Sequence, residues 1–387
     1  MKIIAFYLPQ FHEIPENSEW WGEGFTEWVN VKKAKPLFEG HDQPRIPLNN
    51  NYYNLLNSDT QIWQAKLAKK YGVYGFCYYH YWFGGKLLLE KPMENMLAND
   101  KIDLPFCICW ANEPWTKAWV GEKKVLIPQV YGKREDWEAH FYYLLPFFKD
   151  KRYIYEKGNP LLIIYRPEVI ECLNEMLDCW TQLAKENGLT GLTYAYQNID
   201  FDLQKDKDDS KFTYNIEFQP LYARYDMFKN KFRYLKTLRR KVASIVEKRF
   251  GIDLLRYGAR AFNSIQIDYD KAWNKILERI PESEKNVPGA FVGWDNSPRK
   301  GKKGEVYVHD TPEKFRMYLS KQIERAKKVY KKDLLFMYAW NEWAEGGYLE
   351  PDMRTGYGSL EAIYNALKDN NELPEVEEKE ERICEKN

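Results

Sequence analysis

Short apolar runs recur along the chain, and each ends in polar or aromatic residues. The core of each run is continuous rather than alternating, which is typical of strands buried on both faces of a sheet. The runs occupy residues 3–10, 73–82, 105–115, 160–167, 192–198, 212–220, 289–299 and 334–343. Helical patterns separate the runs, most clearly in residues 59–72, 169–188 and 311–332.

Eight strands alternating with helices predict an α/β protein with a (β/α)8 TIM barrel. A doubly wound sheet is the alternative, and it is disfavoured because no glycine-rich phosphate loop follows any run. In a (β/α)8 barrel, the catalytic residues lie in the loops at the C-terminal ends of the strands. The polar residues that end each run are therefore the candidates for a functional site.

Two segments depart from this alternation. Residues 221–260 carry 12 Lys or Arg against 3 Asp or Glu, and we expect a basic helical insert, spanning 221–288, between strands six and seven. Residues 371–387 are rich in Glu, and we expect a disordered tail there. Because no interdomain linker interrupts the remainder, residues 1–370 are predicted to form a single catalytic domain.

The chain of 387 residues is unusually aromatic, at 16%, with 14 Trp and 29 Tyr. Each Trp and Tyr carries a polar atom that needs a partner, so an apolar core rarely needs this many. Clefts that bind sugars are one explanation, since the C–H faces of sugars stack on aromatic rings. The formal net charge of +1 gives no argument for a nucleic-acid partner.

Few residues are suited to bind a transition metal. The six Cys lie mostly inside apolar runs, the five His are scattered, and no spacing is typical of zinc. We therefore predict neither a metal nor a cofactor. The apolar stretch in residues 1–10 is too short for a signal peptide or a membrane span, and a reducing, cytoplasmic location is the default expectation.

The last apolar run leads directly into WNEWAEGGYLEPD, residues 340–352. Glycosidic bond chemistry commonly uses two carboxyl groups beside the anomeric carbon. Glu342 and Glu345 are three residues apart, so a helical turn would make them face the same way, and their repulsion would raise one pKa. We interpret them as the catalytic pair, with Asn341 and Trp343 as substrate-binding neighbours. The alternative is that they cap a helix or pair with Lys.

Other strand ends supply further candidates for substrate binding, because their side chains can stack on a sugar or bind its hydroxyls. These are His80 and Tyr81 after run two, Trp110, Asn112, Glu113 and Trp115 after run three, Trp294 and Asp295 after run seven, and Glu27 and Trp28 in the long loop after run one. Structural alternatives exist for each group. Glu113 could form an ion pair, His80 could be a core residue, Asp295 could form an Asx turn, and the loop could be a self-packed lid.

Four motifs, in order along the chain, are FYLPQFHEIPENSEWWGEGFTEW (6–28), YGFCYYHYWF (74–83), WANEPW (110–115) and WNEWAEGGYLEPD (340–352). Together they resemble the WbsX-type family, often called glycosyltransferase WbsX, over about residues 1–365. Members of that family typically occur among polysaccharide and O-antigen biosynthesis proteins. The family is related to the endo-α-mannosidases of glycoside hydrolase family 99, which are (β/α)8 barrels.

The resemblance implies roles for the two glutamates. Residues 341–346 are similar to the N-E-W-x-E-G motif of family 99. By that similarity, Glu342 would deprotonate the 2-hydroxyl of the sugar, whose oxygen attacks the anomeric carbon, and Glu345 would be the general acid/base. The reaction would retain configuration and would suit an α-mannoside- or α-rhamnoside-like sugar. Glu350 is similar to a further glutamate in that loop of the family, but we assign it no role.

Three functions are therefore open. We favour a retaining glycoside hydrolase or transglycosidase that acts on a microbial polysaccharide. A glycosyltransferase in O-antigen or capsule synthesis is the alternative, although such enzymes usually have a Rossmann domain or a D-x-D metal site, and the matches at 206–208 and 268–270 lie in polar context. The third function is a non-catalytic carbohydrate-binding barrel, against which the carboxylate pair argues.

The basic segment 221–260 also suggests a partner. Leu235, Leu238, Val242 and Ile245 have helical spacing, so one face of the helix would be apolar and the other cationic. Such a helix could make peripheral contact with an anionic membrane or a lipid-linked glycan. The alternative is a helix that packs on the barrel and solvates its charges.

Overall fold

Eight parallel strands form the barrel in the computed structural model, which describes residues 1–116, 125–199, 207–228 and 265–374. Seven strands are continuous: β1 (Lys2–Tyr7), β2 (Gly75–Phe83), β4 (Phe106–Trp110), β8 (Asn159–Ile164), β9 (Thr193–Asn198), β10 (Phe212–Glu217) and β15 (Leu334–Tyr338). They pair in the order β10-β9-β8-β4-β2-β1-β15. All of these ladders are parallel, so the C-terminal ends of the strands meet at one end of the barrel.

The seventh strand closes the barrel in two pieces. β12 (Asn286–Val287) pairs with β10, and β13 (Gly289–Phe291) pairs with β15, on either side of Pro288. Proline has no N–H to donate to a ladder, which suits a position where the strand changes partner. A Cβ at Gly289 would lie 1.9 Å from the carbonyl oxygen of Glu217, so only glycine allows this approach. The barrel prediction is confirmed.

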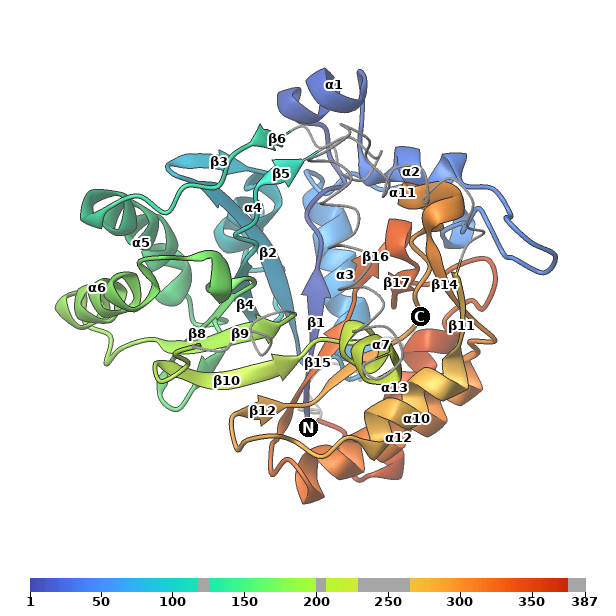
Figure 1. Ribbon diagram of the computed structural model, residues 1–387. Coiled ribbons are helices and arrows are strands. Elements are labelled where there is room, and N and C mark those ends of the chain that lie inside the picture. Colours follow the sequence, from blue (N-terminus) through green and yellow to red (C-terminus); the bar gives the residue numbers. More distant parts are fainter. Residues whose placement is uncertain (117–124, 200–206, 229–264, 375–387) are drawn as a thin grey trace, which may run out of the picture.

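Helices cover the outside of the barrel (Figure 1). They are α3 (Ser58–Lys70), α4 (Lys91–Ala98), α5 (Arg134–Phe148), α6 (Leu173–Glu186), α10 (Tyr269–Glu278), α12 (Pro312–Lys328) and α13 (Gly358–Asp369). The three helices expected from the sequence at 59–72, 169–188 and 311–332 correspond to α3, α6 and α12. α12 begins as its sequence indicates, with Pro312 in the first turn and the Thr311 side chain accepting a hydrogen bond from the Lys314 N–H.

The region between strands six and seven differs from the expected helical insert at 221–288. α7 (Leu221–Phe228) and α10 contact each other, and α10 also packs on α12 as a helix of the barrel wall. Trp273 of α10 stacks on Phe291 and on Tyr318. Before α10, β11 (Ile265–Asp268) pairs with β14 (Glu305–Val308) outside the barrel. Residues 229–264 of the predicted insert lie outside the described residues, as does most of the predicted tail (375–387).

The loops at the C-terminal end of the barrel carry short elements of their own (Figure 1). α1 (Pro15–Trp21) and α2 (Glu27–Lys33) follow β1, the hairpin of β5 (Trp115–Thr116) and β6 (Val125–Ile127) follows β4, and α11 (Ser297–Lys300) follows β13. After β15, β16 (Asn341–Glu342) and β17 (Gly347–Tyr348) flank a 3-10 turn at Trp343–Glu345. Below these loops, Phe6 contacts the rings of Tyr79, Phe218 and Phe336 in the barrel interior.

No helix in the described ranges is long and apolar enough to cross a membrane. The membrane contact predicted for 221–260 concerns residues of which only 221–228 are described, so it stays a prediction.

Candidate active site

A cavity of about 470 Å³ lies among the loops at the C-terminal end of the barrel. Much of its wall is aromatic: Trp21, Phe25, Tyr79, Tyr81, Trp115, Tyr165, Phe218, Trp294 and Tyr338. Tyr79 and Phe218, which pack on Phe6, make part of its floor. A cavity of this size, with many rings and a few charged groups, has the features of a small-ligand site.

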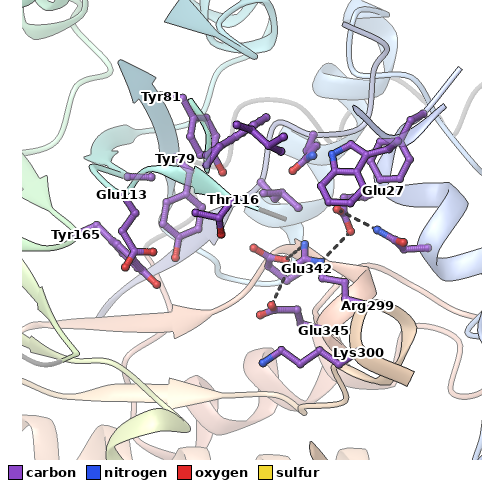
Figure 2. Close-up of a pocket in the computed structure, with 18 of the residues that line it drawn as sticks. Glu27, Tyr79, Tyr81, Glu113, Thr116, Tyr165, Arg299, Lys300, Glu342 and Glu345 are labelled. Carbon is purple, nitrogen blue, oxygen red and sulfur yellow. Dashed lines mark hydrogen bonds and ion pairs between the residues drawn. The ribbon is translucent and has the colours of Figure 1, made fainter. Parts of the chain in front are cut away.

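Glu342 and Glu345 both line this cavity. Glu342 lies on β16, which pairs with β17, and Glu345 ends the 3-10 turn between them. Gly346 follows with a φ of 63°, and a Cβ there would lie 2.7 Å from the backbone nitrogen of Asp295. Glycine therefore lets the turn approach the loop after β13, where the Asp295 N–H donates to the Glu345 carbonyl at 2.6 Å. The result is that both carboxyl groups point the same way (Figure 2).

One guanidinium group joins the two carboxylates. Arg299 on α11 donates from Nη2 to Glu342 at 3.1 Å and from Nη1 to Glu345 at 2.5 Å. Its Nε donates to Glu27 of α2 at 3.0 Å. The Arg299 side chain is only 5% exposed, and Glu27 is 1% exposed, so these pairs are shielded from water. Elements far apart in the sequence are thus tied together at one buried cation (Figure 2).

The electrostatics of the pair are unusual. Burial raises the pKa of Glu342 to about 8; Arg299 opposes this shift, while Glu345 and Glu27 add to it. The second carboxylate is held differently, because Tyr338 Oη donates to one oxygen of Glu345 and Arg299 donates to the other. Two carboxyl groups in different environments are the usual arrangement for dividing acid and base roles.

Glu350, which has no role by resemblance, does not line this cavity. Its carboxylate accepts hydrogen bonds from Tyr53, Gln64, Trp340 and Trp343. Burial raises the pKa of Glu350 to about 7, and these four hydrogen bonds oppose the shift. Glu350 therefore anchors the tryptophans on both sides of Glu342, and it also borders a second cavity of about 410 Å³ beside Trp63.

Seven of the residues named from the sequence line the cavity: Glu27, Tyr81, Glu113, Trp115, Trp294, Glu342 and Glu345. Seven others do not: Trp28, His80, Trp110, Asn112, Asp295, Asn341 and Trp343. Each of these seven is buried against other parts of the protein. Their placement differs from the expectation that they contact substrate.

The alternation of side chains along β2 explains the position of His80. Tyr79 and Tyr81 face the cavity, so His80 and Trp82 face the surrounding helices. His80 Nε2 lies 2.9 Å from His140 Nε2 on α5, and Trp82 stacks on the same ring. Burial lowers the pKa of His80 to about 3, so it is a neutral core histidine.

Trp110 and Asn112 also serve the scaffold. Trp110 packs against His140 and Trp180 outside the strand layer. The Asn112 side chain accepts from the Arg166 N–H and donates to the Arg166 carbonyl, both at 2.7 Å, and so joins the loops after β4 and β8. The next residue, Glu113, lines the cavity instead of Asn112.

The remaining residues hold the loop after β15 in place. Asn341 binds both the N–H and the carbonyl of Leu8 through its side chain, at 2.7 and 2.9 Å. Trp28 donates to the Tyr53 carbonyl and packs on Trp343, whose indole N–H binds Glu350.

Asp295 lies 2.7 Å from His41 Nε2 and accepts from Gln43 at 2.6 Å. It also accepts from the Ser297 N–H at 3.0 Å, which is the contact of the Asx turn considered as the alternative.

Sequence reasoning missed several residues of the cavity, chiefly Tyr79, Tyr165, Arg299, Lys300 and Tyr338. Two-residue alternation from Tyr81 would have found Tyr79. Tyr165 and Tyr338 end apolar runs, which is the same signal that selected the other candidates. Arg299 is the last residue of the run at 289–299 but was not singled out, and Lys300 follows it in a short helix that was not predicted.

Neither D-x-D match is among the residues that line the cavity, and the first match lies partly outside the described residues. Asp268 caps α10 by accepting from the Lys271 N–H, and Asp270 binds Lys314 and Tyr318. Asp206 is not among the described residues. Within the described ranges, no three His, Cys, Asp or Glu side chains come together as a metal site.

The sequence matches the glycosyltransferase WbsX family over residues 3–363. The chain belongs to the WbsX glycosyltransferase family. It is 37% identical over 370 residues to protein WxcX of two Xanthomonas campestris pv. campestris strains, a match that covers 94% of this chain and 49% of each WxcX protein. The chain therefore spans about half the length of the curated relatives it matches. Membership of this family confirms the resemblance and supports a carbohydrate-active enzyme.

Solved structures show the same fold at low sequence identity. The GH99 endo-alpha-mannosidase from Bacteroides thetaiotaomicron is 12% identical, with a TM-score of 0.55 over 96% of this chain and 98% of that one. The structure of that enzyme in complex with bis-tris-propane gives a TM-score of 0.56 at 12% identity, over 95% and 97%. A glycoside hydrolase-like protein gives 0.54 at 12% identity, over 94% and 93%. These structural similarities support the assignment of a (β/α)8 barrel fold.

Proposed function

We propose that this WbsX family member is a retaining glycoside hydrolase or transglycosidase that acts on an α-mannoside- or α-rhamnoside-like unit of a microbial polysaccharide. The observation that carries the proposal is the carboxyl pair of Glu342 and Glu345, brought together by one guanidinium in an aromatic cavity at the C-terminal end of the barrel. Barrel enzymes place their chemistry at this end. The rings of the cavity wall suit the apolar faces of a sugar.

The proposed reaction has two halves. First, Glu342 takes the proton of the sugar 2-hydroxyl, the 2-oxygen bonds to the anomeric carbon, and Glu345 protonates the departing oxygen. This gives a 1,2-anhydro sugar. Glu345 then takes a proton from water or an acceptor hydroxyl, which attacks the anomeric carbon, and the 2-oxygen recovers its proton from Glu342. Two inversions give net retention, without the carboxylate nucleophile that retaining enzymes usually use.

The environment of Glu342 supports its role as base. A sugar hydroxyl is a weak acid, and a base with a higher pKa removes its proton more readily. Glu342, whose pKa is about 8, is a stronger base than an ordinary carboxylate once it is ionised. The observed rate should therefore rise with pH as Glu342 loses its own proton.

The test is to incubate the protein with a panel of α-mannans and α-rhamnans and to follow the first product by proton NMR. We expect cleavage or transfer with the α-anomer formed first. A β-anomer formed first would contradict 2-hydroxyl participation. Failure of the whole panel, together with turnover of a nucleotide sugar, would contradict the hydrolase proposal.

A glycosyltransferase is the second candidate, and a specific observation favours it besides the family name. Lys33, Arg299 and Lys300 all line the cavity, and no ion pair of Lys33 or Lys300 is found within the described residues. Cations at this place could bind the phosphates of a nucleotide or lipid diphosphate leaving group. Calorimetric titration with UDP-, GDP- and dTDP-sugars separates the two candidates. Binding that weakens when Lys300 becomes Gln would favour the transferase.

A further inference from the structure

The proposed reaction uses Glu342 and Glu345 but leaves two charged neighbours unexplained. Glu27 and Arg299 lie beside the pair, and the four side chains form one contiguous cluster (Figure 2). Three of its members are nearly inaccessible, and Glu345 is the most exposed, at 19% for its side chain. An ion cluster taken this far out of water is costly, unless its charges and hydrogen bonds are well matched.

The charges in this cluster do not balance by themselves. Arginine stays protonated in proteins, so the cluster has one fixed positive charge and three carboxyl groups. Ionisation of all three would leave an excess of two negative charges in a buried place. Buried carboxyl groups this close titrate together, and the pair as a whole determines when a proton is held.

Different nitrogens of the Arg299 guanidinium bind different carboxylates. Glu27 binds the Nε–H, while the two terminal nitrogens each bind one member of the proposed catalytic pair. Glu27 lies in the first turn of α2, where the helix dipole favours a negative charge, and Asn30 Nδ2 lies 3.4 Å from its other oxygen. Glu27 thus fixes the plane of the guanidinium and also competes for its charge.

We propose that Glu27 and Arg299 are positioning residues that together set the protonation state of the Glu342–Glu345 pair. Arg299 holds the two carboxyl groups within reach of one sugar ring and favours their charged forms. The negative charge of Glu27 offsets part of the stabilisation that Arg299 gives to the charged forms. As a result, the pair keeps a proton at neutral pH. The proposal rests on the proposed function only in treating the pair as the reactive groups.

Other titratable groups face the cluster, and they do not supply this proton. Burial raises the pKa of Tyr79, Tyr81 and Tyr338 well above the usual value, so these phenols stay neutral near neutral pH. Lys33 of α2 and Lys300 of α11 also line the cavity, but neither is paired with Glu342 or Glu345. Among the described residues, Arg299 is the cation that contacts both carboxyl groups.

The test needs no substrate. The pH titration of the protonated carboxyl group is followed by difference infrared spectroscopy of the ligand-free protein, with Glu342→Gln used to assign the band. Removing a negative neighbour in Glu27→Gln should lower the titration midpoint by roughly one pH unit, a tenfold change in the protonation constant. Removing the cation in Arg299→Gln should shift the midpoint in the opposite direction.

Two further variants control the experiment. Arg299→Lys keeps the charge but cannot bind three carboxylates as a fork does, so its upward shift should be smaller. Glu113→Gln removes a glutamate that lines the same cavity but is paired with Arg166, and it should leave the midpoint unchanged. Circular dichroism checks that each variant is folded.

Shifts of opposite sign in folded Glu27 and Arg299 variants would support the proposal. Shifts in the same direction, or no shift in folded Glu27→Gln, would overturn it. A glycosidase assay has no part in these outcomes, so they stand whether or not the proposed reaction is correct. Where activity is available, the acidic limb of kcat/KM should move in the same directions.

Discussion

Two sides of the cavity use the same groups, an arginine and glutamates, in different ways. On one side, Arg299 binds Glu27, Glu342 and Glu345. On the other side, Arg166 binds Glu113 and Glu168, and Figure 2 shows Glu113 beside Tyr165, apart from Arg299. The Glu113 side chain is 41% exposed, whereas that of Glu342 is 7% exposed. The glutamates that line the two sides therefore differ in how accessible they are to water.

Exposure determines what a carboxyl group can do. Water stabilises an exposed carboxylate and weakens its interactions, so Glu113 is suited to bind a hydroxyl rather than to exchange protons. Burial of Glu342 favours the neutral form and raises its pKa to about 8. The comparison predicts that chemistry resides on the Arg299 side and that the Arg166 side contributes binding.

The largest expected effect comes from Glu345→Gln. An amide cannot donate and recover the proton of the leaving group, so activity on a glycan should fall by roughly 10²–10⁴-fold. An aryl glycoside with a good leaving group needs less protonation and should restore part of the rate. Rates are measured on both substrates, with folding checked by circular dichroism. Wild-type turnover of a poor leaving group by the folded variant would exclude this role.

Glu342→Gln should lose a similar factor, but on every substrate. The base acts on the sugar itself, so a better leaving group cannot bypass it. The ratio of aryl glycoside to glycan activity separates the two variants, because it should rise in Glu345→Gln and stay near the wild-type value in Glu342→Gln. Equal rescue of both variants would mean that the roles have been divided wrongly.

The sequence predicted the barrel and the placement of Glu342 and Glu345 in one cavity, for a physical reason, while the catalytic roles of the two glutamates stay a prediction. Strands buried on both faces need continuous apolar runs, and their ends must carry the polar loops. The E-x-x-E spacing at 342–345 keeps both groups on one side of a single turn, so local geometry was sufficient. Glu27 was found because it lies in a long loop rich in tryptophan.

Contacts between distant segments could not be predicted in this way. Arg299 meets its carboxylates only because the barrel brings the loops after β1, β13 and β15 together. Asn112 and Asn341 were chosen for their chemistry, but their amides join neighbouring loops instead. A polar residue at a strand end has two possible partners, the substrate or the next loop, and only the fold decides between them.

A smaller effect is expected from Glu113→Gln. Its carboxylate lines the cavity opposite the pair, so a loss of sugar binding should raise KM by roughly tenfold or less, equivalent to one or two lost hydrogen bonds, and leave kcat almost unchanged. Steady-state kinetics over a range of glycan concentrations measure both constants. A fall in kcat as large as that of Glu345→Gln would remove the distinction between the two sides.

The smallest expected effect is a change in stability with pH. We expect it from Glu342, which lies on the Arg299 side of the cavity. The pKa of Glu342 is about 8 in the folded protein and near the ordinary glutamate value of 4.5 in the unfolded chain. Between these values the folded state holds a proton that the unfolded chain has released, so the free energy of unfolding falls as pH rises. Below about 4.5 both states are protonated, and above about 8 the full penalty is present.

Glu342→Gln removes this penalty, because an amide does not ionise. Relative to the wild type, its Tm should therefore rise by roughly a few degrees between pH 5 and pH 9, as measured by differential scanning fluorimetry. Glu324→Gln, a surface change on α12 beside Lys328, is a matched control whose Tm difference should be the same at both pH values. A Tm difference between Glu342→Gln and the wild type that does not grow with pH would show that Glu342 is ionised at neutral pH. The buried Glu342 and the exposed Glu113 would then not differ in protonation state.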